Sequence, residues 1–97
     1  MGKDIIYLGV PCSAAGDKQS IIPCTREDEA IAIAVGFHLC GIKNVRVFMQ
    51  NSGYGHCLDV ITSLLMPYGI KIPIEVYPGA DVPQHQPMNK LFRRIKL

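Results

Sequence analysis

Two stretches of the sequence decide the fold: TREDEAIAIAVG, residues 25–36, and MQNSGYG, residues 49–55. The first begins with acidic residues and continues with small and apolar ones, which is typical of a slim helix with an acidic first turn. The second closes an apolar run with a glycine-rich turn, which is typical of a strand leading into a helix. Together they predict an α/β domain.

The segment from Glu27 to Leu39 is predicted to be a helix. Thr25 is a candidate N-cap, with Asp28 three residues later. Cys40-Gly41 ends the segment, because glycine is the usual residue just past a helix end. The residues at helical spacing, which we expect to face the core, are Ala30, Ile33, Ala34 and Phe37.

Strand and helix patterns alternate along the rest of the chain. Helices are expected at about 56–65 and 87–95, the first with core candidates on one face and a stop at Pro67-Tyr68-Gly69. The core candidates are Leu58, Ile61, Ser63, Leu64 and Leu65. Strands are expected at 4–10, 20–24, 44–49 and 71–77. This alternation predicts a three-layer α/β fold, with a mostly parallel sheet and helices on both faces. The length of 97 residues permits a single domain, residues 1–97.

The connection between the first two strands is short. Only about eight residues separate them, whereas a crossover between parallel neighbours needs roughly a dozen. Either the two strands are not parallel neighbours, or one of them is placed by a partner chain. The sequence leaves both alternatives open.

The composition argues for a protein partner and against nucleic acid or membrane. The chain is 48% hydrophobic and 19% charged, more apolar than a small monomer needs. The net charge of +2 comes with no continuous basic face, and the basic residues at the end suit a solvated helix C-terminus. With no signal-peptide pattern and no apolar run of membrane-spanning length, a cytoplasmic protein is expected. The terminal basic residues are Lys90, Arg93, Arg94 and Lys96.

Cysteine and histidine spacing predicts no metal site. The four cysteines include no Cys-x-x-Cys pair, so neither a zinc site nor a thioredoxin-type motif is supported, and buried free thiols are expected. The three histidines, His38, His56 and His85, share no metal-ligand spacing. The cysteines are Cys12, Cys24, Cys40 and Cys57.

Two features could carry chemistry. Glu27, Asp28 and Glu29 make a favourable acidic first turn, and because successive helix residues point about 100° apart, at most one can face a given pocket. The turn from Asn51 to Gly55 lies where a parallel strand meets a helix, which is where α/β sheets bind ligands. A tight turn without function uses the same residues.

In this order and separation, the two stretches resemble the pyrimidine-binding domain of thiamine-diphosphate-dependent 2-oxo acid decarboxylases, most closely the sulfopyruvate and phosphonopyruvate type. In that family a glutamate precedes a small-residue helix and a glycine follows nine positions later, as Glu27 and Gly36 do. Glu29 does not fit this spacing. The run from Met49 to His56 resembles the family's Met-Gln-Asn-Ser-Gly-Leu-Gly-Asn, and PQHQPM at 83–88 resembles its later segment.

The resemblance implies a thiamine-diphosphate-binding fold, shortened near the N-terminus, and a set of site residues. Glu27 would be catalytic, bonding the pyrimidine ring nitrogen and promoting the imino form of the cofactor. The implied cofactor-binding residues are Glu27, Asn51, Ser52, Gly53 and Gly55, with no metal ligand among them.

The resemblance also implies a partner. The diphosphate and its Mg²⁺ are held in this family by a beta-type subunit bearing Gly-Asp-Gly, whereas this chain reads Gly16-Asp17-Lys18. The expected function is therefore the alpha, pyrimidine-binding subunit of a carboxy-lyase, in a homo- or hetero-oligomer. Some residues depart from the family: Tyr77-Pro78-Gly79 replaces His-Arg-Gly, and His56 and Asp59 stand where relatives often have asparagine. The alternative is a catalytically degenerate, shortened homologue that acts as a binding or assembly module.

Overall fold

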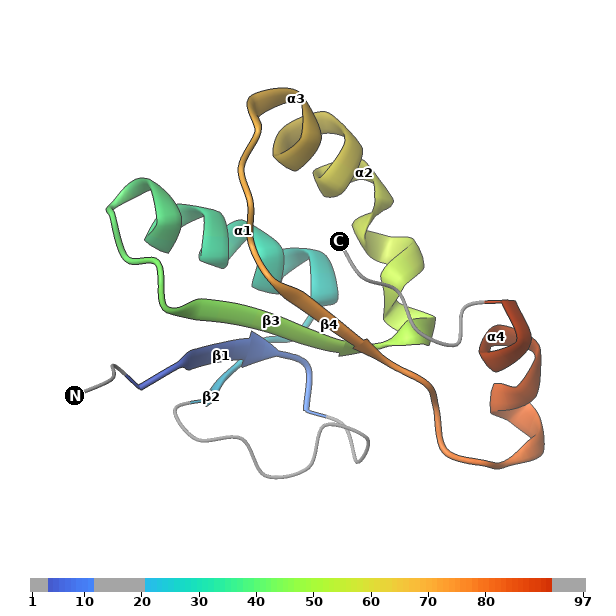
Figure 1. Ribbon diagram of the computed structural model, residues 1–97. Coiled ribbons are helices and arrows are strands. Elements are labelled where there is room, and N and C mark those ends of the chain that lie inside the picture. Colours follow the sequence, from blue (N-terminus) through green and yellow to red (C-terminus); the bar gives the residue numbers. More distant parts are fainter. Residues whose placement is uncertain (1–3, 12–20, 92–97) are drawn as a thin grey trace.

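A four-stranded, all-parallel sheet organises the chain (Figure 1). The computed structural model describes residues 4–11 and 21–91, and the strand order across the sheet is β2-β1-β3-β4. The α/β class with a parallel sheet, predicted from the alternating pattern, is confirmed. The strands are β1 (Ile6–Gly9), β2 (Ile21–Pro23), β3 (Val45–Gln50) and β4 (Ile74–Tyr77).

Strands β1 and β2 are parallel neighbours within this one chain. Leu8 pairs with Ile22 and Gly9 with Pro23, and the Cys24 amide donates to the Gly9 carbonyl at 2.8 Å. The expectation that these strands are not parallel neighbours, or that a partner chain places one of them, is therefore wrong. Both strands are shorter than predicted, so the connection comprises residues 10–20 and comes close to the roughly dozen residues that a parallel crossover needs.

Some predictions fall on residues outside those that the structure describes. These are the thiol Cys12, the segment Gly16-Asp17-Lys18 and the basic residues Arg93, Arg94 and Lys96.

Helix α1 (Glu27–Leu39) has the predicted bounds. Its C-terminal turn is closed by Gly41, whose φ of 85° lies in the left-handed region that favours glycine. The Gly41 amide donates to the His38 carbonyl at 3.0 Å, and the Ile42 amide donates to the Phe37 carbonyl at 2.9 Å. This pair of bonds is the usual glycine-terminated helix end.

The N-terminus of α1 differs from the prediction. The N-cap position is Arg26, whose side chain makes no capping bond, so the assignment of Thr25 as N-cap is wrong. Instead, Glu29 Oε1 accepts from the Thr25 amide at 2.9 Å and from Thr25 Oγ1 at 3.2 Å. A side chain from within the first turn thus satisfies the backbone that precedes the helix.

The buried stripe of α1 is formed by Ala30, Ile31, Ala34 and Val35. Ile33, predicted to face the core, is 37% exposed, and Phe37 is half-buried. Because almost every position of this helix is apolar, spacing could not choose among its possible stripes. The small side chains of the buried stripe allow α1 to pack closely on β1 and β3.

The predicted exit turn after β3 is itself helical. Residues 51–68 form one helical run that changes its hydrogen-bonding pattern and ends at Gly69, where φ is 64°. Ile61 and Leu65 are buried and Leu64 is half-buried, whereas Leu58 and Ser63 are exposed and were wrongly assigned to the core. The run comprises the 3₁₀ helix η2 (Asn51–Cys57), α2 (Leu58–Val60), the π-helical η3 (Ile61–Leu65) and α3 (Met66–Tyr68).

Helix α1 and the run of residues 51–68 lie over the same face of the sheet (Figure 1), so the described residues do not show the helices on both faces that the alternating pattern predicted. The other face carries a mixed set of side chains, with Tyr7 edge-on to Phe48 at 6.4 Å between ring centroids and Arg46 Nη1 3.6 Å from Glu75 Oε2. The strand residues of the helix-covered core are Leu8, Val45, Val47, Met49, Ile74 and Val76.

The C-terminal helix was predicted at 87–95, and its described part is α4 (Gln86–Leu91), preceded by the 3₁₀ turn η4 (Pro83–His85). Both lie beyond the carboxyl ends of the strands (Figure 1). Within residues 4–11 and 21–91, no helix is long and apolar enough to cross a membrane.

Candidate functional site

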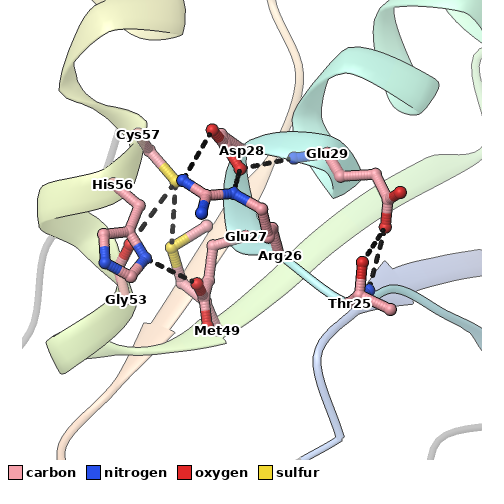
Figure 2. Close-up of polar contacts among 9 residues, drawn as sticks. All are labelled: Thr25, Arg26, Glu27, Asp28, Glu29, Met49, Gly53, His56 and Cys57. Atoms are coloured by element: carbon pink, nitrogen blue, oxygen red, sulfur yellow. Dashed lines mark hydrogen bonds and ion pairs between the residues drawn. The ribbon is translucent and has the colours of Figure 1, made fainter.

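The start of α1 and the start of the helical run after β3 meet at the carboxyl edge of the sheet. Here His56 Nδ1 lies 3.1 Å from Glu27 Oε1 (Figure 2). The Glu27 side chain is 17% exposed, whereas that of His56 is 57% exposed. The carboxylate is therefore largely withdrawn from water and held by a side chain that solvent reaches.

Gly53 lies directly against the Glu27 side chain. A Cβ atom at position 53 would come within 2.4 Å of Glu27 Cγ and Cδ and within 2.6 Å of Glu27 Oε2. Such distances are far inside van der Waals contact, so a side chain at position 53 and the observed Glu27 conformation are incompatible. The glycine is needed here for close approach.

The three acids at the start of α1 point to three different surroundings, as the helix geometry predicts. Glu27 contacts Gly53 and His56 of η2 (Figure 2). Asp28 accepts from Arg26 Nε at 3.0 Å and from Arg26 Nη2 at 3.3 Å, and these hydrogen bonds lower the pKa of the Asp28 carboxyl. Glu29 Oε1 accepts its hydrogen bonds from the amide and the hydroxyl of Thr25.

The Cys57 thiol lies beneath this site and is fully buried. Its sulfur lies 3.6 Å from the Gly53 carbonyl oxygen and 3.8 Å from Met49 Sδ, two acceptors for its one proton (Figure 2). Burial, followed by the negative charges of Glu27 and Asp28, raises the pKa of Cys57 to about 12. The thiol is therefore protonated at neutral pH and is no nucleophile there.

The other described cysteines are also free thiols. Cys24 is buried, and burial raises the pKa of its thiol. Cys40 is exposed, so the expectation of a buried thiol is wrong at this position. It occupies the C-cap position of α1, next to the exposed Leu39.

A second group of polar contacts ties η2 to the C-terminal segment. Asn51, only 1% exposed, donates from Nδ2 to Asn89 Oδ1 at 3.0 Å. Asn89 Oδ1 also accepts from the Gly79 amide at 2.9 Å, and Asn89 Nδ2 donates to the Gly79 carbonyl at 3.1 Å. Asn89 thus joins η2, the loop after β4 and α4.

Sequence reasoning missed Asn89 as a member of this site. The signal that could have found it is its position one residue after the segment 83–88, which was already singled out by resemblance. Nothing in the sequence indicated its partners, because they lie ten and thirty-eight positions away along the chain.

The predicted binding residues do not all share one environment. Asn51 and Gly53 are buried, whereas Ser52 and Gly55 are exposed. Ser52 Oγ accepts from Gln50 Nε2 at 3.2 Å, and the same Gln50 nitrogen lies 3.3 Å from His85 Nδ1. A Cβ at Gly55 would meet nothing within 4 Å. The structure brings Gly53 against Glu27 and places Asn51, Ser52 and Gly55 around the same 3₁₀ turn.

Comparison with known proteins adds three matches, each named sulfopyruvate decarboxylase subunit alpha. The protein from Methanothermobacter thermautotrophicus is 42% identical over 84 aligned residues, covering 78% of this chain and 50% of that protein. The chain is a relative of sulfopyruvate decarboxylase alpha subunits. The protein from Methanocaldococcus jannaschii is 34% identical, with 81% of this chain and 49% of that protein covered.

The relationship to sulfopyruvate decarboxylase alpha subunits confirms the family resemblance drawn from the two stretches. The chain spans about half the length of the curated relatives it matches. No protein-family model matches the chain.

A hollow also lies elsewhere on the described part of the molecule, away from Glu27. That hollow, about 730 Å³, lies at the far end of the helical run and has a mostly apolar lining that also includes Lys71. Its lining includes Ile61, Leu65, Met66, Ile70, Ile72 and Pro73. In the described part of the chain, no group of three or more histidine, cysteine, aspartate or glutamate side chains is placed to hold a metal ion.

Proposed function

We propose that this chain is the pyrimidine-binding, alpha-type subunit of a thiamine-diphosphate-dependent decarboxylase. Its substrate would be a 2-oxo acid with an acidic head group, of the sulfopyruvate or phosphonopyruvate type. The observation that carries the proposal is the placement of Glu27. Its carboxylate, 17% exposed, lies at the carboxyl edge of a parallel sheet against the backbone of Gly53. The names of the three relatives support the reaction class.

The residues at this edge fit the aminopyrimidine end of thiamine diphosphate. A largely buried carboxylate can share a proton with a ring nitrogen, and such a charge-assisted bond is strong where water is scarce. Glu27 is the residue that would make this bond. Asn51, Ser52, Gly53 and Gly55 would line the ring from η2, whose glycines let the backbone approach closely. When bound, the cofactor supplies the electron sink for loss of carbon dioxide.

A partner subunit completes the proposed site. The diphosphate and Mg²⁺ are assigned to a beta-type subunit, since the chain reads Gly16-Asp17-Lys18 in place of Gly-Asp-Gly. The relatives' names as alpha subunits support a second kind of subunit. The active site would then lie between the two chains, with Glu27 contributed by this one.

The test is affinity purification of the tagged chain from its source cells, followed by mass spectrometry and a decarboxylation assay with sulfopyruvate and phosphonopyruvate. The proposal expects a stoichiometric partner bearing Gly-Asp-Gly, thiamine diphosphate in the complex, and carbon dioxide release that the chain alone does not give. A self-associated chain with neither partner nor cofactor would contradict it and favour a binding or assembly module.

A further inference from the structure

The Glu27 carboxylate is held from two sides by a single 3₁₀ helix. On one side lies the bare backbone of Gly53, where a Cβ would overlap Cγ, Cδ and Oε2 of Glu27. On the other side, His56 Nδ1 lies 3.1 Å from Glu27 Oε1. Glu27 Oε2 therefore lies against the Gly53 backbone of η2, and Glu27 Oε1 lies against the His56 imidazole (Figure 2).

The 3₁₀ geometry explains why these two residues act together. With three residues per turn, positions i and i+3 of a 3₁₀ helix are eclipsed, so residue 56 stands directly over residue 53. The missing side chain at position 53 leaves a gap in this row, and the Glu27 carboxylate fills it. The imidazole of the next residue in the row, His56, then reaches the carboxylate.

Resting on the proposed function, we infer that His56 is a positioning residue that fixes the Glu27 carboxylate where it meets the pyrimidine ring. The bond requires His56 to carry a proton on Nδ1 and donate it to Glu27 Oε1, which leaves Glu27 Oε2 for the ring. His56 touches neither cofactor nor substrate in this role. It acts through the orientation of Glu27.

We expect His56 to affect the orientation of the Glu27 carboxylate more than the stability of the fold. His56 is 57% exposed on its side chain, and exposed ion pairs contribute little to folding. Without the His56 hydrogen bond, in contrast, the Glu27 carboxylate would sample other rotamers. Misplacing a reacting group by about 1 Å costs roughly a hundredfold in rate. Loss of His56 should therefore lower catalysis while the fold persists.

The first test needs no cofactor. In the full chain labelled with ¹⁵N-histidine, the NMR signals of the His56 ring report which nitrogen carries the proton in mildly alkaline buffer. We expect the Nδ1–H form of His56, and its loss in Glu27→Met, with His38 and His85 as internal references that do not change. A His56 ring protonated on Nε2, or one that Glu27→Met leaves unaltered, would overturn it.

The second test uses the reconstituted complex with thiamine diphosphate and compares two variants. His56→Asn keeps a donor, because the asparagine amide nitrogen is as many bonds from the backbone as Nδ1, whereas His56→Leu has none. We expect His56→Leu to lower kcat/KM about tenfold or more and His56→Asn to stay within about threefold. Both variants should melt within about 4 °C of the wild type.

The outcomes distinguish a failure of the positioning role of His56 from a failure of the proposed function. If Glu27→Gln removes activity while His56→Leu is as active as the wild type, the positioning role is wrong and the proposed function stands. If the wild-type complex does not decarboxylate any 2-oxo acid, the proposed function is wrong, and the tautomer measurement alone decides whether His56 holds Glu27.

Discussion

The Glu27 side chain occupies the space that a side chain on Gly53 would need. The ideal Cβ position at residue 53 is 2.4 Å from Glu27 Cδ, whereas at Gly55, two residues later in the same helix, it is free of any atom within 4 Å. Neither glycine has a positive φ, so backbone strain does not distinguish them. The two glycines therefore form a matched pair that isolates the contact with Glu27.

Gly53→Ala is predicted to displace the Glu27 carboxylate. The overlap should cost about 1–3 kcal/mol in the free energy of unfolding, as overpacking of a close contact usually does. Activity of the reconstituted complex should fall about a hundredfold, because Glu27 no longer reaches its position. Gly55→Ala is the control for stability, expected to change the free energy of unfolding little because a Cβ there meets no atom within 4 Å. Equal effects of the two substitutions on the free energy of unfolding would show that the Glu27 side chain does not require a glycine at position 53.

Asn89→Ala is predicted to loosen the carboxyl edge of the sheet. It removes the acceptor of the Asn51 Nδ2 bond and both bonds to the Gly79 backbone, and loss of a partner for buried polar groups costs about 1–3 kcal/mol. Denaturant unfolding monitored by circular dichroism measures the change. Gln84→Ala, at an exposed position of η4, should stay within about 0.5 kcal/mol. A comparably small change in both variants would argue against Asn89 as the residue that joins η2, the loop after β4 and α4.

The buried thiol of Cys57 predicts a loss of stability in alkali. Its pKa is raised from 9.0 to about 12 in the folded chain, so between these values the unfolded state releases the proton and the folded state keeps it. The free energy of unfolding is then unaffected by this thiol below about pH 9 and falls as pH rises towards 12, by at most about 1.4 kcal/mol per pH unit.

Unfolding by urea at several pH values between 8 and 11 measures this slope. Cys57→Ala should be less stable at pH 8, because a buried side chain is shortened, yet should lose less stability on going to pH 11 than the wild type does. Parallel curves for the two proteins would contradict the raised pKa.

Two glycines of α1 and its C-terminal turn should respond oppositely to alanine. Gly41, with φ of 85°, is in the left-handed region, and Gly41→Ala should destabilise by about 1–2 kcal/mol. Gly36 lies at an exposed position well inside α1, away from the helix ends, and has open space around it. Gly36→Ala should therefore stabilise the fold by about 0.5–1 kcal/mol. Thermal unfolding of both variants checks the sign, and destabilisation by Gly36→Ala would be inconsistent with this account of the helix.

The sequence predicted those features that rest on local chemistry. The bounds of α1 follow from its acidic start and Gly41, and the parallel sheet follows from the alternation of strands and helices. The buried stripe of α1 could not be predicted, because Ile31 and Ile33 are equally apolar and only the sheet decides which is covered.

The candidate site was predictable only in part, because its residues follow from local motifs and its contacts follow from tertiary packing. Glu27 and Gly53 were identified by their motifs, but their mutual contact is a tertiary fact with no local signal. The bond of His56 to Glu27 and the bonds of Asn89 to Gly79 and Asn51 depend on how separate elements meet. The helical nature of residues 51–57 was missed because two glycines favour a turn as readily as a 3₁₀ helix.

The most direct test of the central claim compares Glu27→Gln with Glu29→Gln in the reconstituted complex, by decarboxylation of sulfopyruvate at saturating thiamine diphosphate. Glu27 faces Gly53 and His56, whereas Glu29 is exposed and bonded to Thr25, so the two substitutions remove equal charge from different surroundings. We predict that Glu27→Gln lowers kcat at least about a hundredfold and that Glu29→Gln leaves it nearly intact. Equal losses in the two variants would contradict the assignment of Glu27 as the residue that serves the cofactor.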